Sequence, residues 1–182
     1  MKKAAFLDRD GVINKKAPDH GYITRWEDFE FLSGVPEAIA RLNQAGFLVI
    51  VVTNQRGIAR SLFSLEALKR IHSEMTGKLA AAGSRLDAIY YCPHDIEPPC
   101  TCRKPAPGML LTAAAEHHID LHQSWMIGDS VSDREAGERA GCRTITIAPL
   151  PVPLGERPDL FAHSLPDAVK LILTLSEPSL SS

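Results

Sequence analysis

Short apolar runs alternate with longer stretches of helical periodicity along the whole chain. Five runs fit buried strands: residues 4–7, 47–52, 88–91, 125–127 and 144–147. Five stretches with an apolar residue at every third or fourth position fit helices: residues 35–44, 65–82, 108–117, 133–140 and 166–175. Ser64 and Ser132 stand where N-caps are expected, and Gly46, Gly83 and Gly141 stand where helices should end.

Strands that are apolar throughout and alternate with helices are typical of a parallel sheet covered on both faces. We therefore predict a doubly wound α/β fold that forms one domain over residues 1–176. Residues 14–34 and 57–65 are too few to build a large cap domain. Residues 149–158, with four prolines, are predicted to form an irregular surface loop, and residues 177–182 a disordered tail.

Composition narrows the classes of protein that fit. The 182 residues are 45% hydrophobic and 23% charged, which is typical of a globular protein with one substantial core. The 20 basic and 22 acidic residues give a formal charge of −2, which argues against a surface for nucleic acid or anionic membranes. The apolar run after Lys3 is too short for a signal peptide, and no run is long enough to span a bilayer. We expect a cytoplasmic monomer with no nucleic-acid or membrane partner.

Two aspartates, Asp8 and Asp10, follow the first predicted strand, and Gly11 turns the chain after them. In doubly wound sheets, ligands bind beyond the carboxyl ends of the strands. Two carboxylates this close repel each other, and a divalent cation with oxygen ligands removes that penalty. The pair therefore suggests a Mg²⁺ site that contains a nucleophile, with an Asp-rich turn as the alternative.

The fourth predicted strand ends at another pair of carboxylates. Asp129 could complete the Mg²⁺ shell together with Asp8 and the backbone carbonyl of Asp10. Asp133, at the start of the following helix, could orient that shell or merely favour its helix N-terminus.

Two further groups of polar residues fit a bound phosphate. Thr53 and Asn54 follow the second predicted strand, where a hydroxyl, an amide and the backbone N–H groups of the next turn can hold phosphate oxygens. Thr53 could instead cap a strand-end turn. Arg103 and Lys104 precede a predicted helix and suggest an anion whose charge Lys104 balances against the nucleophile, with a solvated basic pair as the alternative.

Four metal-type donors crowd into residues 92–102: Cys92, His94, Cys100 and Cys102. Three sulfurs and one imidazole nitrogen fill a tetrahedral Zn²⁺ shell without an open position, so a zinc ion here would be structural. Free thiols on a proline-rich loop are the alternative interpretation. Cys142 is predicted to be a buried thiol.

Other ring-bearing residues show no partner in the sequence. We predict that the histidines are surface or packing residues at positions 72, 117, 118, 122 and 163. Trp26 and Trp125 are also predicted to pack. The residues at 20–22 either contact a substrate or form a simple turn.

In their order along the chain, these motifs resemble those of the haloacid dehalogenase superfamily of aspartyl-phosphate enzymes. The motifs are Asp-x-Asp-Gly, Thr-Asn, Lys and Gly-Asp-Ser-x-x-Asp, and they span residues 8–133. Within the superfamily, the chain most resembles the D-glycero-D-manno-heptose-1,7-bisphosphate 7-phosphatases. It shares with them Asp-His-Gly-Tyr at 19–22, Thr-Asn-Gln at 53–55, Gly-Ile-Ala-Arg at 57–60 and Cys-Arg-Lys-Pro at 102–105. Its short zinc loop, residues 92–102, also resembles that of the related histidinol-phosphate phosphatases.

The resemblance implies a Mg²⁺-dependent phosphatase that acts on a sugar bisphosphate and carries a structural Zn²⁺. Asp8 is then the nucleophile, Asp10 is the acid and base, and Thr53 and Lys104 hold the transferring phosphoryl group. The metal is held by Asp8, Asp10 and Asp129. The substrate-binding residues that it implies are Arg9, Asp19, His20, Gly21, Tyr22, Asn54, Gln55, Arg56, Arg103 and Ser130. Among them, Arg103 and Arg56 would meet the second phosphate, and the zinc loop would act as a lid.

Two alternatives remain open. A histidinol-phosphate phosphatase needs no second-phosphate site, so a strong preference for a bisphosphate would separate the two activities. A non-catalytic, zinc-stabilised binding module would not require the pair Asp8 and Asp10.

Overall fold

The computed structural model describes residues 1–18, 21–148 and 160–176 of the chain. Its strands are β1 (Lys3–Leu7), β2 (Phe47–Asn54), β3 (Ala88–Cys92), β4 (Trp125–Gly128), β5 (Arg143–Ile147) and β6 (Phe161–Ala162). Its helices are α1 (Val35–Gln44), α2 (Leu65–Ala81), α3 (Gly108–His117), α4 (Val131–Ala140) and α5 (Leu165–Ser176), with 3₁₀ turns η2 (Trp26–Asp28) and η3 (Leu121–Gln123). The predicted loop at 149–158, the tail at 177–182 and the predicted substrate residues Asp19 and His20 lie outside the described residues.

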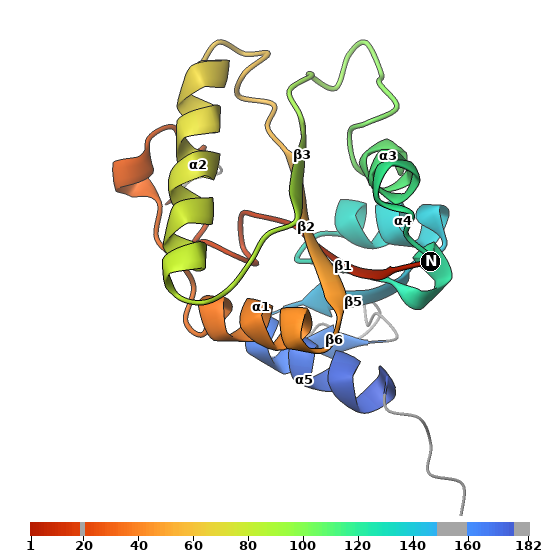
Figure 1. Cartoon of the computed structure of the whole chain (residues 1–182). Helices are drawn as coiled ribbons and strands as arrows, with labels where there is room; N and C mark the ends of the chain where they lie inside the picture. Colours follow the sequence, from red (N-terminus) through yellow and green to blue (C-terminus); the bar gives the residue numbers. More distant parts are fainter. Residues whose placement is uncertain (19–20, 149–159, 177–182) are drawn as a thin grey trace, which may run out of the picture.

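The strands form one parallel sheet in the order β3-β2-β1-β4-β5-β6. The chain starts near the middle of the sheet, winds outward through β2 and β3, and returns to the other side of β1 with β4 (Figure 1). Ala5 accordingly pairs with Val49 on one side and with Trp125 on the other. The predicted doubly wound α/β fold is confirmed. The carboxyl ends of β1, β2 and β4 lie side by side at the switch point, where such folds bind ligands.

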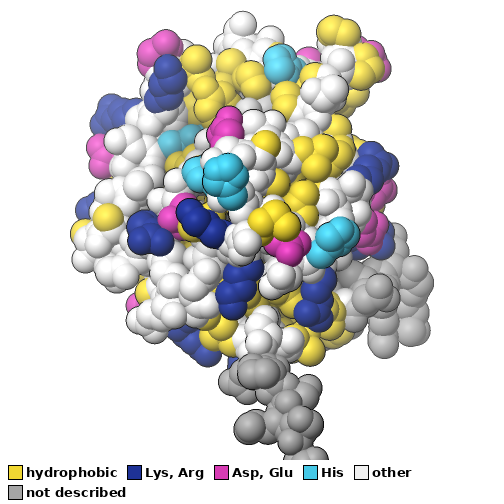
Figure 2. Space-filling model, turned by 45° about the vertical axis from the view of Figure 1, so that its right-hand side comes forward, with side chains coloured by type: hydrophobic (Ala, Val, Ile, Leu, Met, Phe, Trp, Pro, Cys, Tyr) yellow, Lys and Arg dark blue, Asp and Glu magenta, His cyan; other side chains and the backbone are white. Residues whose placement is uncertain are grey.

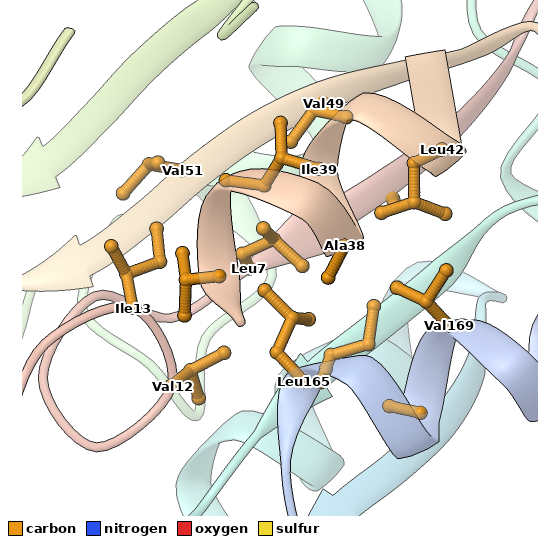
Figure 3. Close-up of a cluster of buried hydrophobic side chains, with 14 of the residues drawn as sticks. Leu7, Val12, Ile13, Ala38, Ile39, Leu42, Val49, Val51, Leu165 and Val169 are labelled. Carbon is orange, nitrogen blue, oxygen red and sulfur yellow. The ribbon is translucent and has the colours of Figure 1, made fainter. Parts of the chain in front are cut away.

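Successive residues of the central strands belong to two separate cores, one on each face of the sheet. Ala5 and Leu7 of β1 belong to the core with α1, α2 and α5, whereas Ala4 and Phe6 belong to the core with α3 and α4. Figure 1 shows the two groups of helices on either side of the sheet. Figure 3 shows the first core, where side chains of β1 and β2 meet those of α1 and α5: Leu7, Val49, Val51, Ala38, Ile39, Leu42, Leu165 and Val169. Because β1 is buried on both faces, its position in the sheet is fixed, and so is the position of the residues that directly follow it.

Helix α4 begins two residues earlier than predicted. Its N-cap is Ser130, and the prediction of Ser132 is wrong. The Ser130 hydroxyl accepts from the backbone N–H of Asp133, and the Asp133 carboxylate accepts from the backbone N–H of Ser130 at 3.1 Å. This reciprocal capping box pairs residues three positions apart. Ser132 also has a carboxylate at that spacing, Glu135, but in the structure it is Ser130 and Asp133 that form the box, and Ser132 lies inside the helix.

Strand β6 was not predicted, because two residues are too few for a period-two pattern to show. Both tryptophans pack against the core as predicted, Trp125 fully buried and Trp26 partly so. Cys142 is buried, also as predicted, and burial raises the pKa of its thiol to about 12.

The surface carries both signs of charge. On the face shown in Figure 2, Lys and Arg side chains are interspersed with Asp and Glu side chains. Across the described residues, we find no helix that combines the length and the apolar character needed to cross a bilayer.

Candidate active site

The turn after β1 places Asp8 at the carboxyl edge of the sheet. The backbone N–H of Asp8 donates to the Ile127 carbonyl of β4 at 2.9 Å, so the strand ladder extends to the first aspartate. Gly11 then adopts φ +93°, and its N–H donates to the Asn14 carbonyl at 2.7 Å. A Cβ atom at position 11 would lie 1.8 Å from Oδ2 of Asp129, so only glycine lets the turn approach that carboxylate.

The ammonium of Lys104 links Asp8 to Asp133. Its Nζ lies 2.9 Å from Oδ1 of Asp8 and 2.5 Å from Oδ1 of Asp133, and it donates to the Val52 carbonyl at 2.7 Å. Burial opposes the charge of Lys104, but the two carboxylates outweigh burial and raise its pKa above the ordinary value. Burial also raises the pKa of Asp8 to about 7, with Lys104 acting in the opposite direction. The three groups form a buried ionic network beside the pocket.

Asp10 lies in a cradle of N–H donors. Asn14 Nδ2 donates to Oδ1 at 2.9 Å, Gln55 Nε2 donates to Oδ2 at 3.1 Å, and Arg9 Nη2 donates to both oxygens at 3.0 and 2.9 Å. Burial alone would raise the pKa of Asp10, but the charge of Arg9 and these hydrogen bonds outweigh burial and lower it. The cradle therefore fixes the orientation of the carboxylate next to Asp8 and keeps it ionised.

Arg9 is 1% exposed, and its guanidinium also reaches His72 of α2, with Nη1 lying 3.3 Å from Nε2 of the imidazole. His72 is buried, as expected of a packing residue, and it also has a polar partner that the sequence does not show, because α2 turns this side chain toward the end of β1. A substrate contact by Arg9 stays a prediction, and its contacts in the structure are with Asp10 and His72.

Three carboxylates converge where the sequence predicts Mg²⁺. Asp8, Asp129 and Asp133 each place an oxygen within 4.8 Å of the others. The ammonium of Lys16 lies 2.6 Å from Oδ2 of Asp129. Burial opposes the charge of Lys16, but Asp129, with Asp8 and Asp133 further away, outweighs burial and raises its pKa. Clustered carboxylate oxygens are the ligands that a hard divalent metal ion prefers, and the nearby Lys16 ammonium shows that this cluster binds a positive charge.

These groups line a pocket of about 190 Å³. Its walls are formed by Asp8, Asp10, Lys16, Thr53, Asn54, Lys104, Asp129, Ser130, Ser132 and Asp133. Thr53 Oγ1 accepts from Gln55 Nε2 at 2.9 Å, which leaves the threonine proton available to donate into the pocket. The side-chain amide of Asn54 binds the backbone N–H and carbonyl of Lys104 at 3.1 and 3.0 Å. Asn54 thus holds the segment that carries Lys104.

A second pocket, of about 220 Å³, adjoins the first and shares Asp10, Lys16 and Asn54 with it. Its other walls include Gly21 and Tyr22, two of the residues predicted to bind substrate. The two pockets together form a cavity that extends from Asp8 toward the loop after β1.

The two arginines predicted to meet a second phosphate differ in their surroundings. Arg56 forms an ion pair with Asp95 of the zinc loop. Arg103 has a buried Nη1 without a hydrogen-bond partner among the described residues. Such a donor is costly to leave unpaired.

The zinc loop brings its four predicted donors together. The Sγ atoms of Cys92, Cys100 and Cys102 and Nδ1 of His94 lie within 4.8 Å of one another, with neighbouring pairs 3.2 to 3.6 Å apart. Three thiols and one imidazole at these separations fit a tetrahedral zinc shell. The predicted convergence is confirmed, and the zinc ion itself is part of the proposal below.

Known proteins resemble the chain over nearly its whole length. A protein of Pasteurella multocida named D-glycero-beta-D-manno-heptose-1,7-bisphosphate 7-phosphatase is 42% identical in an alignment that covers 94% of this chain and 97% of that protein. A protein of the same name from Vibrio cholerae is also 42% identical, over 93% of both chains. The chain belongs to the heptose-bisphosphate phosphatase family. The predicted resemblance is therefore confirmed.

Two further comparisons agree with membership of this family. A model described as HAD-hydrolase-like matches residues 101–149, which include Lys104, Asp129 and Asp133. A crystal structure of D,D-heptose 1.7-bisphosphate phosphatase from B. bronchiseptica, complexed with magnesium and phosphate, matches with a TM-score of 0.84 at 35% identity. The match covers 96% of this chain and 99% of that one.

Three residues of the heptose-bisphosphate phosphatase site were missed from the sequence: Asn14, Lys16 and His72. None of them directly follows a predicted strand or belongs to a motif that carries the family resemblance. For Asn14 a cue existed, because a polar residue four positions after Asp10 in a tight turn can reach back to that carboxylate. For Lys16 and His72 no local pattern distinguishes them from surface residues.

Proposed function

We propose that the protein is a Mg²⁺-dependent phosphatase that removes the 7-phosphate of D-glycero-D-manno-heptose 1,7-bisphosphate through an aspartyl-phosphate intermediate. The observation that carries the proposal is Asp8, which is bound by the buried ammonium of Lys104 and lies beside Asp10 on one rim of the pocket. The names of the relatives support the sugar, in its beta form, as the substrate.

In the first step, an oxygen of Asp8 bonds to phosphorus while the bond from phosphorus to the sugar oxygen breaks. Asp10 gives its proton to that oxygen. In the second step, Asp10 takes a proton from the water that attacks phosphorus, and Asp8 and inorganic phosphate are released. N–H donors lower the pKa of Asp10 in the absence of substrate. We expect the negative charge of a bound phosphate to raise this pKa, so that Asp10 takes up a proton from solvent water before the first step.

Asp8, the backbone carbonyl of Asp10 and Asp129 would hold Mg²⁺, and Asp133 would orient this shell through Lys104 and Ser130. When bound, the metal ion screens the nucleophile from the phosphate and stabilises the developing charge. The Thr53 hydroxyl and the Lys104 ammonium bind the phosphoryl oxygens. This arrangement has support from the Thr53 proton that is left to donate and from the position of Lys104.

The second pocket would accommodate the sugar, with Gly21 and Tyr22 in its wall and Asp19 and His20 next to them in sequence. Arg103 would bind the 1-phosphate, which supplies the acceptor that its buried Nη1 lacks, and Arg56 would assist. Gln55 acts through Thr53 and Asp10.

Zn²⁺ would hold the loop at residues 92–102 as a lid. The single domain, the monomeric state and the cytoplasmic location stay predictions.

Phosphate release from a substrate panel tests the proposal. Wild-type protein with Mg²⁺ should prefer heptose 1,7-bisphosphate to heptose 7-phosphate and to histidinol phosphate. Asp8→Asn should lower kcat on the order of 10³-fold or more with the fold intact. Retention of a tenth of the activity would refute the role of Asp8.

A variant at the far end of the site tests the substrate. Arg103→Ala should lower kcat/KM for the bisphosphate by roughly ten- to a hundredfold and leave the monophosphate nearly unchanged. Equal losses on the two substrates would mean that Arg103 does not recognise the second phosphate. A preference for histidinol phosphate, whose family shares the short zinc loop, would replace the heptose assignment.

A further inference from the structure

Arg9 carries its charge into the protein interior, where two groups hold it from different sides. Its Nε and Nη2 bind the carboxylate of Asp10, and its Nη1 lies 3.3 Å from Nε2 of His72. His72 is 7% exposed, and its ring packs against that of Tyr91 of β3, with the centroids 6.0 Å apart. A guanidinium buried in this way needs an acceptor for each N–H that faces the protein.

The contact fixes the protonation state of His72. Arginine only donates hydrogen bonds, so Nε2 must be the acceptor. An imidazole that accepts at Nε2 is neutral and carries its proton on Nδ1, whereas an imidazolium would bring two cations together in the interior. In agreement, burial and the charge of Arg9 lower the pKa of His72 to about 3.

We propose that His72 is a positioning residue for the proton transfers of Asp10. Its neutral Nε2 fixes the plane of the Arg9 guanidinium, and that guanidinium fixes the plane of the Asp10 carboxylate. The proposal rests on the proposed function, since it requires that Asp10 protonates the leaving sugar oxygen.

Loss of the acceptor at position 72 would let the Arg9 guanidinium turn to find another partner for Nη1. Nη2 and Nε belong to the same planar group, so their contacts with Asp10 change as well. Asn14 and Gln55 still hold the carboxylate, one at each oxygen. The effect should therefore be a misaligned Asp10 rather than a lost one. In the first step it should be large only for a substrate whose leaving oxygen must be protonated by Asp10.

Two variants and two substrates separate this role from simple packing. His72→Leu removes the acceptor and keeps an apolar side chain of similar reach, whereas His72→Gln offers an amide oxygen to Nη1. The substrates are heptose 1,7-bisphosphate, whose sugar oxygen must be protonated as it leaves, and p-nitrophenyl phosphate, whose leaving group needs no proton. Hydrolysis of the aspartyl phosphate is common to both substrates, so the comparison uses kcat/KM, which reports the steps up to the departure of the leaving group. For His72→Leu, kcat/KM on the sugar should fall by roughly tenfold, and kcat/KM on the aryl ester by less than about threefold. His72→Gln should recover most of the loss.

Met75, one turn further along α2 and fully buried, supplies the matched control. Met75→Ala should lower the melting temperature without changing the ratio of the two kcat/KM values. An unchanged ratio in His72→Leu as well, or no recovery in His72→Gln, would overturn the proposal.

A measurement on the wild-type protein does not depend on whether the variants fold. The ¹⁵N chemical shifts of labelled His72 should show a protonated Nδ1 and an unprotonated Nε2 throughout the range from about pH 5 to pH 8. A proton on Nε2, or titration within this range, would overturn the proposal. Failure of the wild-type protein to release phosphate from either substrate would instead refute the proposed function, and with it the role of Asp10 on which His72 acts.

Discussion

Replacing Lys104 with Met tests the ionic network at the centre of the site. The Lys104 side chain is 2% exposed, and its ammonium lies 2.9 Å from Asp8 and 2.5 Å from Asp133. Methionine has a similar length, so the change removes the charge with little change in packing. It leaves two carboxylates close together without the cation between them.

The size of the effect follows from that uncompensated charge. Removing one partner of a buried ion pair costs about 3–5 kcal/mol of unfolding free energy. For a chain of this size, 1 kcal/mol corresponds to about 2–4 °C, so the melting temperature should fall by roughly 6–20 °C in metal-free buffer. Millimolar Mg²⁺ should recover part of the loss, because a bound divalent cation compensates the same carboxylates.

Urea denaturation and thermal melting, each with and without Mg²⁺, measure both effects. The control is Lys170→Met, the same substitution at an exposed lysine of α5, which should change the stability by no more than about 0.5 kcal/mol. If Lys104→Met is as stable as the wild type without metal, the network does not hold the site together. If Mg²⁺ raises the stability of the two proteins equally, the carboxylates beside Lys104 are not the metal ligands.

Three further predictions concern the cations and one buried imidazole. Lys16→Met removes the ammonium that lies 2.6 Å from Asp129. Because Mg²⁺ then no longer has to displace an internal cation, its affinity measured by calorimetry should rise several-fold, and an unchanged affinity would contradict this. Metal analysis should find one zinc per chain, and its removal should lower the melting temperature in a way that Mg²⁺ does not restore; protein purified without chelator that contains no zinc would refute the zinc site. The pKa of His72 is about 3 in the folded protein, against 6.5 for an unperturbed histidine. Between these two values the unfolded chain binds more protons than the folded protein, so the free energy of unfolding falls as the pH falls through this window. From pH 7 to pH 5, wild-type protein should lose about 2 kcal/mol more than His72→Gln in urea denaturation, and equal losses would show that the folded protein does not keep His72 neutral.

The residues at strand ends could be predicted because the sheet fixes their place almost completely. Once β1 is recognised as a buried strand, its ladder with β4 determines where Asp8 lies to within a residue. Parallel strands then bring Thr53 and Asp129 to the same edge. Lys104, 96 positions from Asp8, follows no strand. Its place before a predicted helix suggested an anion site, and the order of the family motifs supported that assignment.

Residues on helices and in loops could not be predicted in this way. The contact of His72 with Arg9 depends on the rotation of α2 about its axis, which is set by the packing of Ile71, Met75 and Leu79 in the core with the sheet. A helix of this length offers several polar positions that would fit the sequence pattern equally well. The N-cap of α4 was misassigned for a related reason. Ser130 and Ser132 are each followed three positions later by a carboxylate, Asp133 and Glu135, and only the folded structure shows that the first pair forms the capping box.

The charges around the pocket give a reason why the proposed phosphate chemistry would need a divalent cation. Four acidic side chains are paired with three basic ones among the described residues: Asp8, Asp10, Asp129 and Asp133 with Arg9, Lys16 and Lys104. The resulting charge of −1 would repel a phosphate dianion, whereas one bound divalent cation changes it to +1. A metal ion at Asp129 would also release the Lys16 ammonium, whose side chain already lines the adjoining pocket. Replacement of the Lys16 ammonium by a divalent metal ion at Asp129 would therefore make the site attract anions instead of repelling them. It would also leave the ammonium free to lie beside the sugar.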